Sequence, residues 1–163
     1  MLQKSITKAR EGFTIIELLI VIAIIAILAG LVLNNFQGAQ AKARDTQRVT
    51  DINNVHSKLE EFYNDNNAYP QTFSAATFAG IDAQSLVDPD GTAIVINAAV
   101  ADEAAADAVA NPTTSGGEYR YIAFPTGCTA TPANCTGYVM KTFVERPTST
   151  TPNPYRKEGL NNP

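Results

Sequence analysis

An unbroken apolar run near the N-terminus constrains this chain more than any other feature. From Leu18 to Leu33 no side chain is charged or able to hydrogen-bond, and the run follows directly on a carboxylate, Glu17. As a helix, residues 13–33 rise about 31 Å at 1.5 Å per residue, which matches a hydrocarbon core of roughly 30 Å. The run therefore predicts a membrane-spanning helix. A carboxylate at its edge is costly in lipid and indicates a function.

The residues before the run predict its orientation. Lys4, Lys8 and Arg10 outweigh Glu11, so the leader is basic. Basic residues stay on the cytoplasmic side of a membrane, and we expect everything after Leu33 to be exported.

Two ordinary targeting segments are alternatives. A secretory signal peptide needs small residues at a cleavage site soon after the run. Ile27 occupies one of those positions before Ala29, and the A-x-A triplet at 39–41 lies far from the end of the run. A plain signal-anchor explains the run but not Glu17.

The segment Glu11-Gly12-Phe13-Thr14-Ile15-Ile16-Glu17 resembles the type IV pilin and pseudopilin family. The family signature is a basic leader, a glycine, a phenylalanine, a glutamate at the fifth residue after the cut, and a long apolar helix. Gly12, Phe13 and Glu17 match it in register. The resemblance implies that prepilin peptidase removes residues 1–12, cutting after Gly12, and methylates the new amine of Phe13.

The resemblance also implies a role for Glu17. In a filament core, the Glu17 carboxylate would pair with the Phe13 amine of a neighbouring subunit, so that neither charge is left alone. Alternatively, Glu17 reaches the lipid headgroups beside its own amine. The uncut precursor would be an inner-membrane protein with an exported head, delivered to a pilus assembly platform.

Helical spacing continues beyond the apolar run. Apolar residues recur at steps of three and four, which predicts an amphipathic second half, residues 34–64, of the same helix. The stripe is Val49, Ile52, Val55, Leu59, Phe62 and Tyr63. We expect the charged residues beside it to form a solvated face: Lys42, Arg44, Asp45, Arg48, Asp51, Lys58, Glu60 and Glu61. Asn64–Asn67 and the following Tyr69-Pro70 end the helix.

Residues 65–163 predict a small head of three or four strands. The segments 92–97, 118–124 and 137–145 are rich in β-branched and aromatic residues, and 98–110 is an alanine-rich short helix. The proline-rich residues 146–163 are predicted to be an irregular tail. A small sheet needs an apolar cover, which the amphipathic half-helix supplies. The predicted fold class is therefore α+β, a long N-terminal helix packed against an antiparallel sheet, as the resemblance also implies.

Cys128 and Cys135 are the two cysteines, and both lie on the side predicted to be exported. Oxidising compartments favour a disulfide between them. Two free thiols are the alternative. In the family, a disulfide near the C-terminus often closes a surface loop.

Asp88-Pro89-Asp90-Gly91 has two interpretations. The sequence makes a good turn unaided. The oxygens of Asp88 and Asp90 are also calcium ligands by type, and major pseudopilins have a similar Asp-Pro motif before a calcium-binding loop. No other cofactor is expected.

Nothing in the sequence indicates an enzyme. The one histidine, His56, lies on the amphipathic helix, where a packing role is the simpler interpretation, and no nucleophile–base set can be built from it. The net charge of −4 becomes more negative once the basic leader is removed. An acidic surface does not favour nucleic-acid binding by this chain alone.

The sequence therefore predicts a structural subunit. The first hypothesis is a pilin that polymerises through its N-terminal helix into an extracellular type IV pilus for adhesion, motility or DNA uptake. The second is a pseudopilin of a type II secretion system. The third is a membrane-anchored binding protein that never polymerises.

Overall fold

The computed structural model describes residues 12–76, 78, 80–113 and 118–163, apart from the side chains of residues 34 and 35. The predicted leader, except for Gly12, lies outside the described residues. The chain divides into two compact units, Met1–Ala39 and Gln40–Pro163. One helix, α1 (Ile15–Asn66), begins in the first unit and ends in the second.

In the N-terminal unit, α1 carries the apolar run on every side. The large apolar side chains from Ile15 to Leu33 are all exposed. Among the described residues, α1 is the helix whose length and composition suffice to cross a membrane. Isoleucine and valine are modest helix formers in water. In lipid, however, the backbone must satisfy its own hydrogen bonds, and a helix does so within one segment.

The end of α1 lies where the asparagines of the sequence predict it. Asn67 follows the last helical residue with φ 53°, and its N–H donates to the carbonyl of Tyr63 at 2.7 Å. A left-handed residue at this position is a common helix stop, and asparagine tolerates it better than most residues.

The head contains a four-stranded sheet in the order β1 (Val95–Ile96), β2 (Tyr119–Phe124), β3 (Gly137–Thr142) and β4 (Tyr155–Glu158). The β2–β3 and β3–β4 pairs are antiparallel, whereas β1 runs parallel to β2. The prediction of a wholly antiparallel sheet is therefore wrong for the β1–β2 pair. The connection from β1 to β2 crosses over through the short helix α2 (Glu103–Ala108), and such a crossover permits parallel strands.

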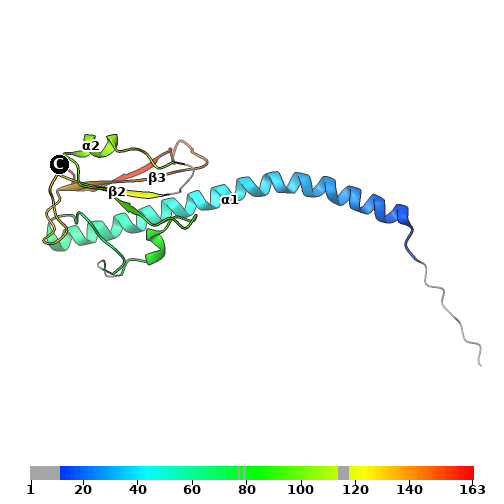
Figure 1. Ribbon diagram of the computed structural model, residues 1–163, viewed down its shortest axis with the longest axis horizontal. Helices are drawn as coiled ribbons and strands as arrows, with labels where there is room; N and C mark the ends of the chain where they lie inside the picture. The colour runs from blue at the N-terminus through cyan, green and yellow to red at the C-terminus, as the bar shows by residue number, and fades with distance from the viewer. Residues whose placement is uncertain (1–11, 77, 79, 114–117) are drawn as a thin grey trace, which may run out of the picture. The chain divides into compact units, whose positions relative to one another are not determined.

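The sheet is buried on both faces. Tyr119, Tyr121, Ala123, Tyr138 and Met140 face α1 and pack with Ile52, Val55 and Leu59. On the opposite face, Ile122, Phe124 and Val139 pack with Ala106 of α2. Figure 1 shows α2 on the side of the sheet away from α1. The α+β architecture that we predicted is confirmed, and so is the apolar stripe from Ile52 to Tyr63, whereas Val49 lies outside both core clusters.

Three segments differ from the prediction. Residues 146–163 are not wholly irregular, because Tyr155–Glu158 forms β4 at the edge of the sheet. The strand is short and mostly charged, so it lacks the apolar alternation that identifies a strand in a sequence. The strand predicted over 92–97 is reduced to Val95–Ile96, and the one predicted to reach 145 ends at Thr142.

Candidate functional site

The N-terminus of α1 is closed by a reciprocal pair of side chains. The backbone N–H and the hydroxyl of Thr14 both donate to Glu17 Oε2, at 2.8 and 2.6 Å. In return, the N–H of Glu17 donates to Thr14 Oγ1 at 3.3 Å. This arrangement is a capping box, which satisfies backbone donors that the first turn of a helix leaves unpaired.

The capping box fixes where the helix begins relative to the predicted cleavage junction. Gly12, Phe13 and Thr14 precede α1, and the Phe13 side chain is 93% exposed. A Cβ added to Gly12 would meet no atom within 4 Å. The fold of the described chain therefore makes no steric demand for glycine at position 12. Cleavage after Gly12 and methylation of Phe13 stay predictions.

The capping box has a recognisable sequence pattern. Thr14-Ile15-Ile16-Glu17 has the T-x-x-E spacing of a capping box immediately before an apolar run. The two roles that we predict for Glu17, pairing in a filament and reaching the lipid headgroups, do not include this local role in the cap. Within the described residues, both hydrogen bonds of the carboxylate go to Oε2, which leaves Oε1 without a partner.

In the head, Arg48 of α1 is the centre of a buried cluster of charges. Its guanidinium contacts four carboxylates: Asp88 at 2.8 Å, Asp90 at 2.9 Å, Glu145 at 2.7 Å and Asp45 at 3.2 Å. The Arg48 side chain is 1% exposed. Hydrogen bonds to these carboxylates raise the pKa of Arg48, although burial opposes the shift. The cluster joins α1 to two loops of the head.

The solvated face predicted for this half of α1 is therefore wrong at three positions, because Asp45, Arg48 and Asp51 are buried. Asp45 accepts the backbone N–H groups of residues 145 and 146 at 2.9 and 2.8 Å. Asp51 accepts the hydroxyl of Tyr119 at 2.8 Å, and burial raises the pKa of this carboxyl. The loops that cover this face come from distant parts of the chain, so helical periodicity alone does not indicate them.

The turn predicted at Asp88–Gly91 is present. The Gly91 N–H donates to the carbonyl of Asp88 at 2.7 Å, and Gly91 has φ 89°. The Asp90 N–H donates to Asp88 Oδ1 at 3.0 Å. The carboxylates of Asp88 and Asp90 lie around Arg48, and no three acidic, histidine or cysteine side chains of the described chain are grouped as a metal site. Calcium binding, the second interpretation of these aspartates, is not tested by this geometry.

Near the end of α1, Glu60 lies at the centre of a second polar network. Its carboxylate accepts the hydroxyls of Tyr69 at 2.9 Å and Tyr138 at 3.0 Å, and the backbone N–H of Leu160 at 3.2 Å. His56 Nδ1 lies 2.7 Å from the Tyr138 hydroxyl, so the histidine has the packing position that we predicted. Burial raises the pKa of Tyr69 to about 12 and lowers that of His56. The network holds the C-terminal residues against the helix.

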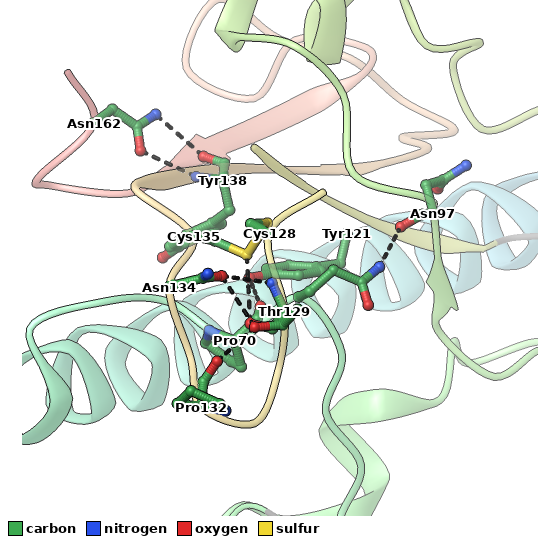
Figure 2. The surroundings of a disulfide bond; sticks show 11 residues. Pro70, Asn97, Tyr121, Cys128, Thr129, Pro132, Asn134, Cys135, Tyr138 and Asn162 are labelled. Atoms are coloured by element: carbon green, nitrogen blue, oxygen red, sulfur yellow. Dashed lines mark hydrogen bonds between the residues drawn. A yellow bond between two sulfur atoms is a disulfide. The ribbon is translucent and has the colours of Figure 1, made fainter. Parts of the chain in front are cut away.

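The two cysteines form the predicted disulfide, with Cys128 and Cys135 joined at 2.08 Å. Figure 2 shows the loop that they close. Inside it, Asn134 Oδ1 accepts the N–H of Thr129 at 2.6 Å. At its end, Cys135 and Tyr69 exchange both backbone hydrogen bonds, at 2.9 and 3.1 Å. The loop is thereby fixed to the segment that follows α1.

The chain is similar to known proteins over its N-terminal part. Residues 7–33 match the family model of the prokaryotic N-terminal methylation motif. A type IV wide pilus major component, PilA4 of Thermus thermophilus, is 47% identical over 72 residues, 44% of this chain and 54% of that protein. A type II secretion system core protein G of Pectobacterium carotovorum is 41% identical over 63 residues, 39% of this chain and 40% of that protein.

A third relative is the type IV major pilin protein PilA of Myxococcus xanthus, 34% identical over 69 residues, 42% of this chain and 31% of that protein. The matches thus span about a third to a half of the length of these curated relatives. No solved structure matches the chain significantly.

The fold and the N-terminal segment define the class: this is an α+β protein with an apolar N-terminal helix, and over that helix it is similar to type IV pilins. More particularly, residues 7–33, which reach into the first half of that helix, match the prokaryotic N-terminal methylation motif, and the relatives include type IV pilins and a type II secretion system core protein. These relatives are components of filaments and of a secretion system.

Proposed function

We propose that this chain is the subunit of a type IV pilus. Prepilin peptidase removes residues 1–12, the Phe13 amine is methylated, and the assembly platform moves the apolar half of α1 from the membrane into a filament core. The head is then carried on the outside of an extracellular filament.

One observation carries this proposal: the capping box starts α1 two residues after Phe13 and, among the described residues, leaves one oxygen of Glu17 unused. Cleavage creates an α-amine at Phe13, whose ordinary pKa is near ~7.7, so it is largely protonated at neutral pH. Glu17 keeps Oε2 on its own Thr14 and offers Oε1 to the amine of a neighbouring subunit. Helix capping and subunit pairing are therefore compatible.

The exposed apolar helix agrees with this assignment. Its side chains from Ile15 to Leu33 need an apolar surrounding, which lipid supplies before assembly and neighbouring helices supply afterwards. A filament core of such helices leaves no room for an isolated charge, so pairing of Glu17 sets the stagger between subunits.

Mass spectrometry of sheared surface filaments tests the proposal. The expected result is a filament protein that begins at methylated Phe13. Recovery of the chain only from membranes, with residues 1–12 still attached, would overturn both cleavage and assembly.

A secretion pseudopilin is the second candidate, because a type II secretion core protein is among the relatives. Deletion of the chain distinguishes the two. A pilus subunit is required for surface filaments and leaves secretion of exoproteins intact, whereas a pseudopilin shows the reverse. A membrane-anchored protein that never polymerises predicts that neither changes.

A further inference from the structure

Within the described part of the head, Leu160 is the one large apolar side chain left exposed, at 76%. It lies at the tip of a tight turn, in which the Asn162 N–H donates to the carbonyl of Gly159 at 3.3 Å. The Leu160 N–H itself donates to the carboxylate of Glu60 on α1 at 3.2 Å. Leu160 is therefore presented to solvent at the end of the head where α1 ends, close to the C-terminus marked in Figure 1.

The turn that carries Leu160 is held from both sides. The Gly159 N–H donates to the carbonyl of Tyr138 at 3.1 Å. The Asn162 amide makes two bonds to the main chain of Tyr138, accepting its N–H at 3.1 Å and donating to its carbonyl at 3.2 Å, as Figure 2 shows. A side chain on a fixed turn loses little backbone entropy when it enters a contact.

A hollow of about 280 Å³ lies near the start of the head. Its walls are the turns of α1 from Lys42 to Thr50 and the loop of residues 146–151. Val49 lines it, and this is the residue of the predicted apolar stripe that belongs to neither core cluster. The hollow therefore has an apolar side chain in its wall and room for one aliphatic side chain.

Four threonines also line this hollow, and the hydroxyls of three of them are engaged locally. Thr46 and Thr50 each donate to the carbonyl one turn earlier on α1, at 2.9 Å. Thr148 accepts the N–H of Thr151 at 3.0 Å. Because these hydroxyls are already bonded to the nearby main chain, the methyl groups are what the side chains offer to a partner. The wall suits an aliphatic side chain better than a polar ligand.

Two cations stand beside the hollow without a carboxylate of their own. Lys42 and Arg146 both line it, and neither makes an ion pair within the described part of the chain. Asp45 lines it as well, but its carboxylate is taken up by Arg48 and by two backbone N–H groups. The rim of the hollow is therefore basic, although the protein as a whole is acidic.

The end of the head that carries Leu160 has the opposite charge. The carboxylate of Glu60 lies directly under the turn. Asp65 is exposed in the last turn of α1, and no described cation pairs with it. Opposite charges favour an approach in which the Leu160 end of one copy meets the hollow of another, and they disfavour the contact of two like ends.

Leu160 does not reach the hollow of its own chain. Glu60, which holds the turn, lies ten residues beyond Thr50 on α1, a rise of about 15 Å. An apolar side chain and a matching hollow at different places on one molecule make a heterologous contact, and repetition of such a contact builds rings or open filaments. The occupant that fits the hollow is therefore a second copy of this chain.

We propose that Leu160 of one subunit inserts into this hollow of a neighbouring subunit, against Val49. Lys42 and Arg146 then face the acidic end of the neighbour. The inference rests on the proposed function, and it adds to the pairing of Glu17 a second contact that lies wholly in the heads.

Cysteine cross-linking of surface filaments tests the contact directly. The full-length chain carries Leu160→Cys together with Thr46→Cys, and the sheared filaments are oxidised and separated on a non-reducing gel. A contact between opposite ends links each copy to two others, so a ladder of dimers, trimers and larger species is expected. Leu160→Cys combined with Asn64→Cys, an exposed position near the end of α1, is the control and should give no ladder. Cys128 and Cys135 are already bonded to each other.

Leu160→Ser tests what the contact contributes to assembly. The side chain is exposed in the single subunit, so the head of the variant should melt as the parent does in detergent. The yield of sheared filaments is expected to fall roughly tenfold, the effect of losing the burial of one leucine. Leu160→Met keeps an apolar side chain and is the matched control, which should assemble as the parent does.

The outcomes separate this contact from the proposed function. Absence of a ladder in filaments of the Leu160→Cys and Thr46→Cys pair, or a filament yield of Leu160→Ser equal to that of the parent, would overturn the contact and leave the pilus subunit in place. If the parent chain itself forms no filaments, the proposed function and the contact are both wrong.

Discussion

The Nε group of Arg48 donates to Asp88 Oδ2 at 2.8 Å, and both side chains are almost fully excluded from solvent. Arg48 lies on α1 and Asp88 in the turn before β1, forty residues later in the chain. The pair therefore fixes this turn of the head to its helix. Such a pair is costly to break from one side only, because the other charge stays buried.

We predict that Arg48→Met destabilises the head by about 3–5 kcal/mol, the usual effect of removing one partner of a buried ion pair. Four carboxylates lose their shared cation, and Asp88 is left buried without a charge partner. Thermal unfolding of the full-length chain in detergent, followed by circular dichroism, measures the loss.

Arg44→Met is the control for this prediction. Arg44 also pairs with Glu145, at 2.6 Å, but its side chain is 35% exposed. Exposed pairs contribute about 0–1 kcal/mol. If both variants lower the melting temperature equally, burial is not the reason that the ion pairs of Arg48 stabilise the head.

Calcium is predicted to leave the stability of the head unchanged. Arg48 already neutralises the carboxylates of Asp88 and Asp90, and a calcium ion would have to displace a hydrogen-bonded guanidinium. Melting temperatures in excess calcium and in excess chelator should agree within about 1 °C, since a ligand that does not bind the native state adds no stability. A clear rise with calcium, absent in Asp90→Asn, would instead establish the calcium site.

The stability of the head is expected to fall in acid through Glu145. Hydrogen bonds from Arg44 and Arg48 lower the pKa of this carboxyl to about 2, from an ordinary value of 4.5. A carboxyl whose pKa is lower in the folded state stabilises the fold above its unfolded pKa. That contribution is lost as the pH falls from about 4.5 towards 2.

Unfolding free energies measured between pH 6 and pH 2 check this dependence. In Glu145→Gln the slope between about pH 4.5 and pH 2 should become smaller, because the variant has no proton to take up there. Glu158→Gln, an exposed carboxyl on β4, is the comparison. An unchanged slope in Glu145→Gln would assign the acid sensitivity to other groups.

Much of the head followed from local patterns in the sequence. The stripe that includes Ile52, Val55 and Leu59 has helical spacing and is buried as predicted, and Tyr121 and Met140 face it from paired strands. In the helix and in each strand, the buried side chains lie on one face of a single element. The spacing of apolar residues along the sequence therefore indicates which side chains are buried.

The charged residues of α1 could not be placed in this way. Arg48 is buried because the Asp88 turn and Glu145 cover it, and both are far away in sequence. These two segments reach Arg48 only when the chain is folded. The spacing of charged residues along one helix does not predict that contact. The capping box is different, since Thr14 and Glu17 are neighbours and the signal is local.

The last prediction separates the two roles of Glu17, as a cap and as a charge. Glutamine at this position can still complete a capping box with Thr14 but carries no charge. If pairing with the Phe13 amine drives assembly, Glu17→Gln keeps membrane insertion and loses most surface filaments. Thr14→Val removes the hydroxyl, weakens the helix start by about 1 kcal/mol, and leaves the charge in place, so filaments should persist. The measurement is the yield of sheared filaments relative to membrane-inserted precursor, with the N-terminal residue identified by mass spectrometry. Loss of filaments in Thr14→Val as complete as in Glu17→Gln would show that the cap, and not the charge, is what assembly requires.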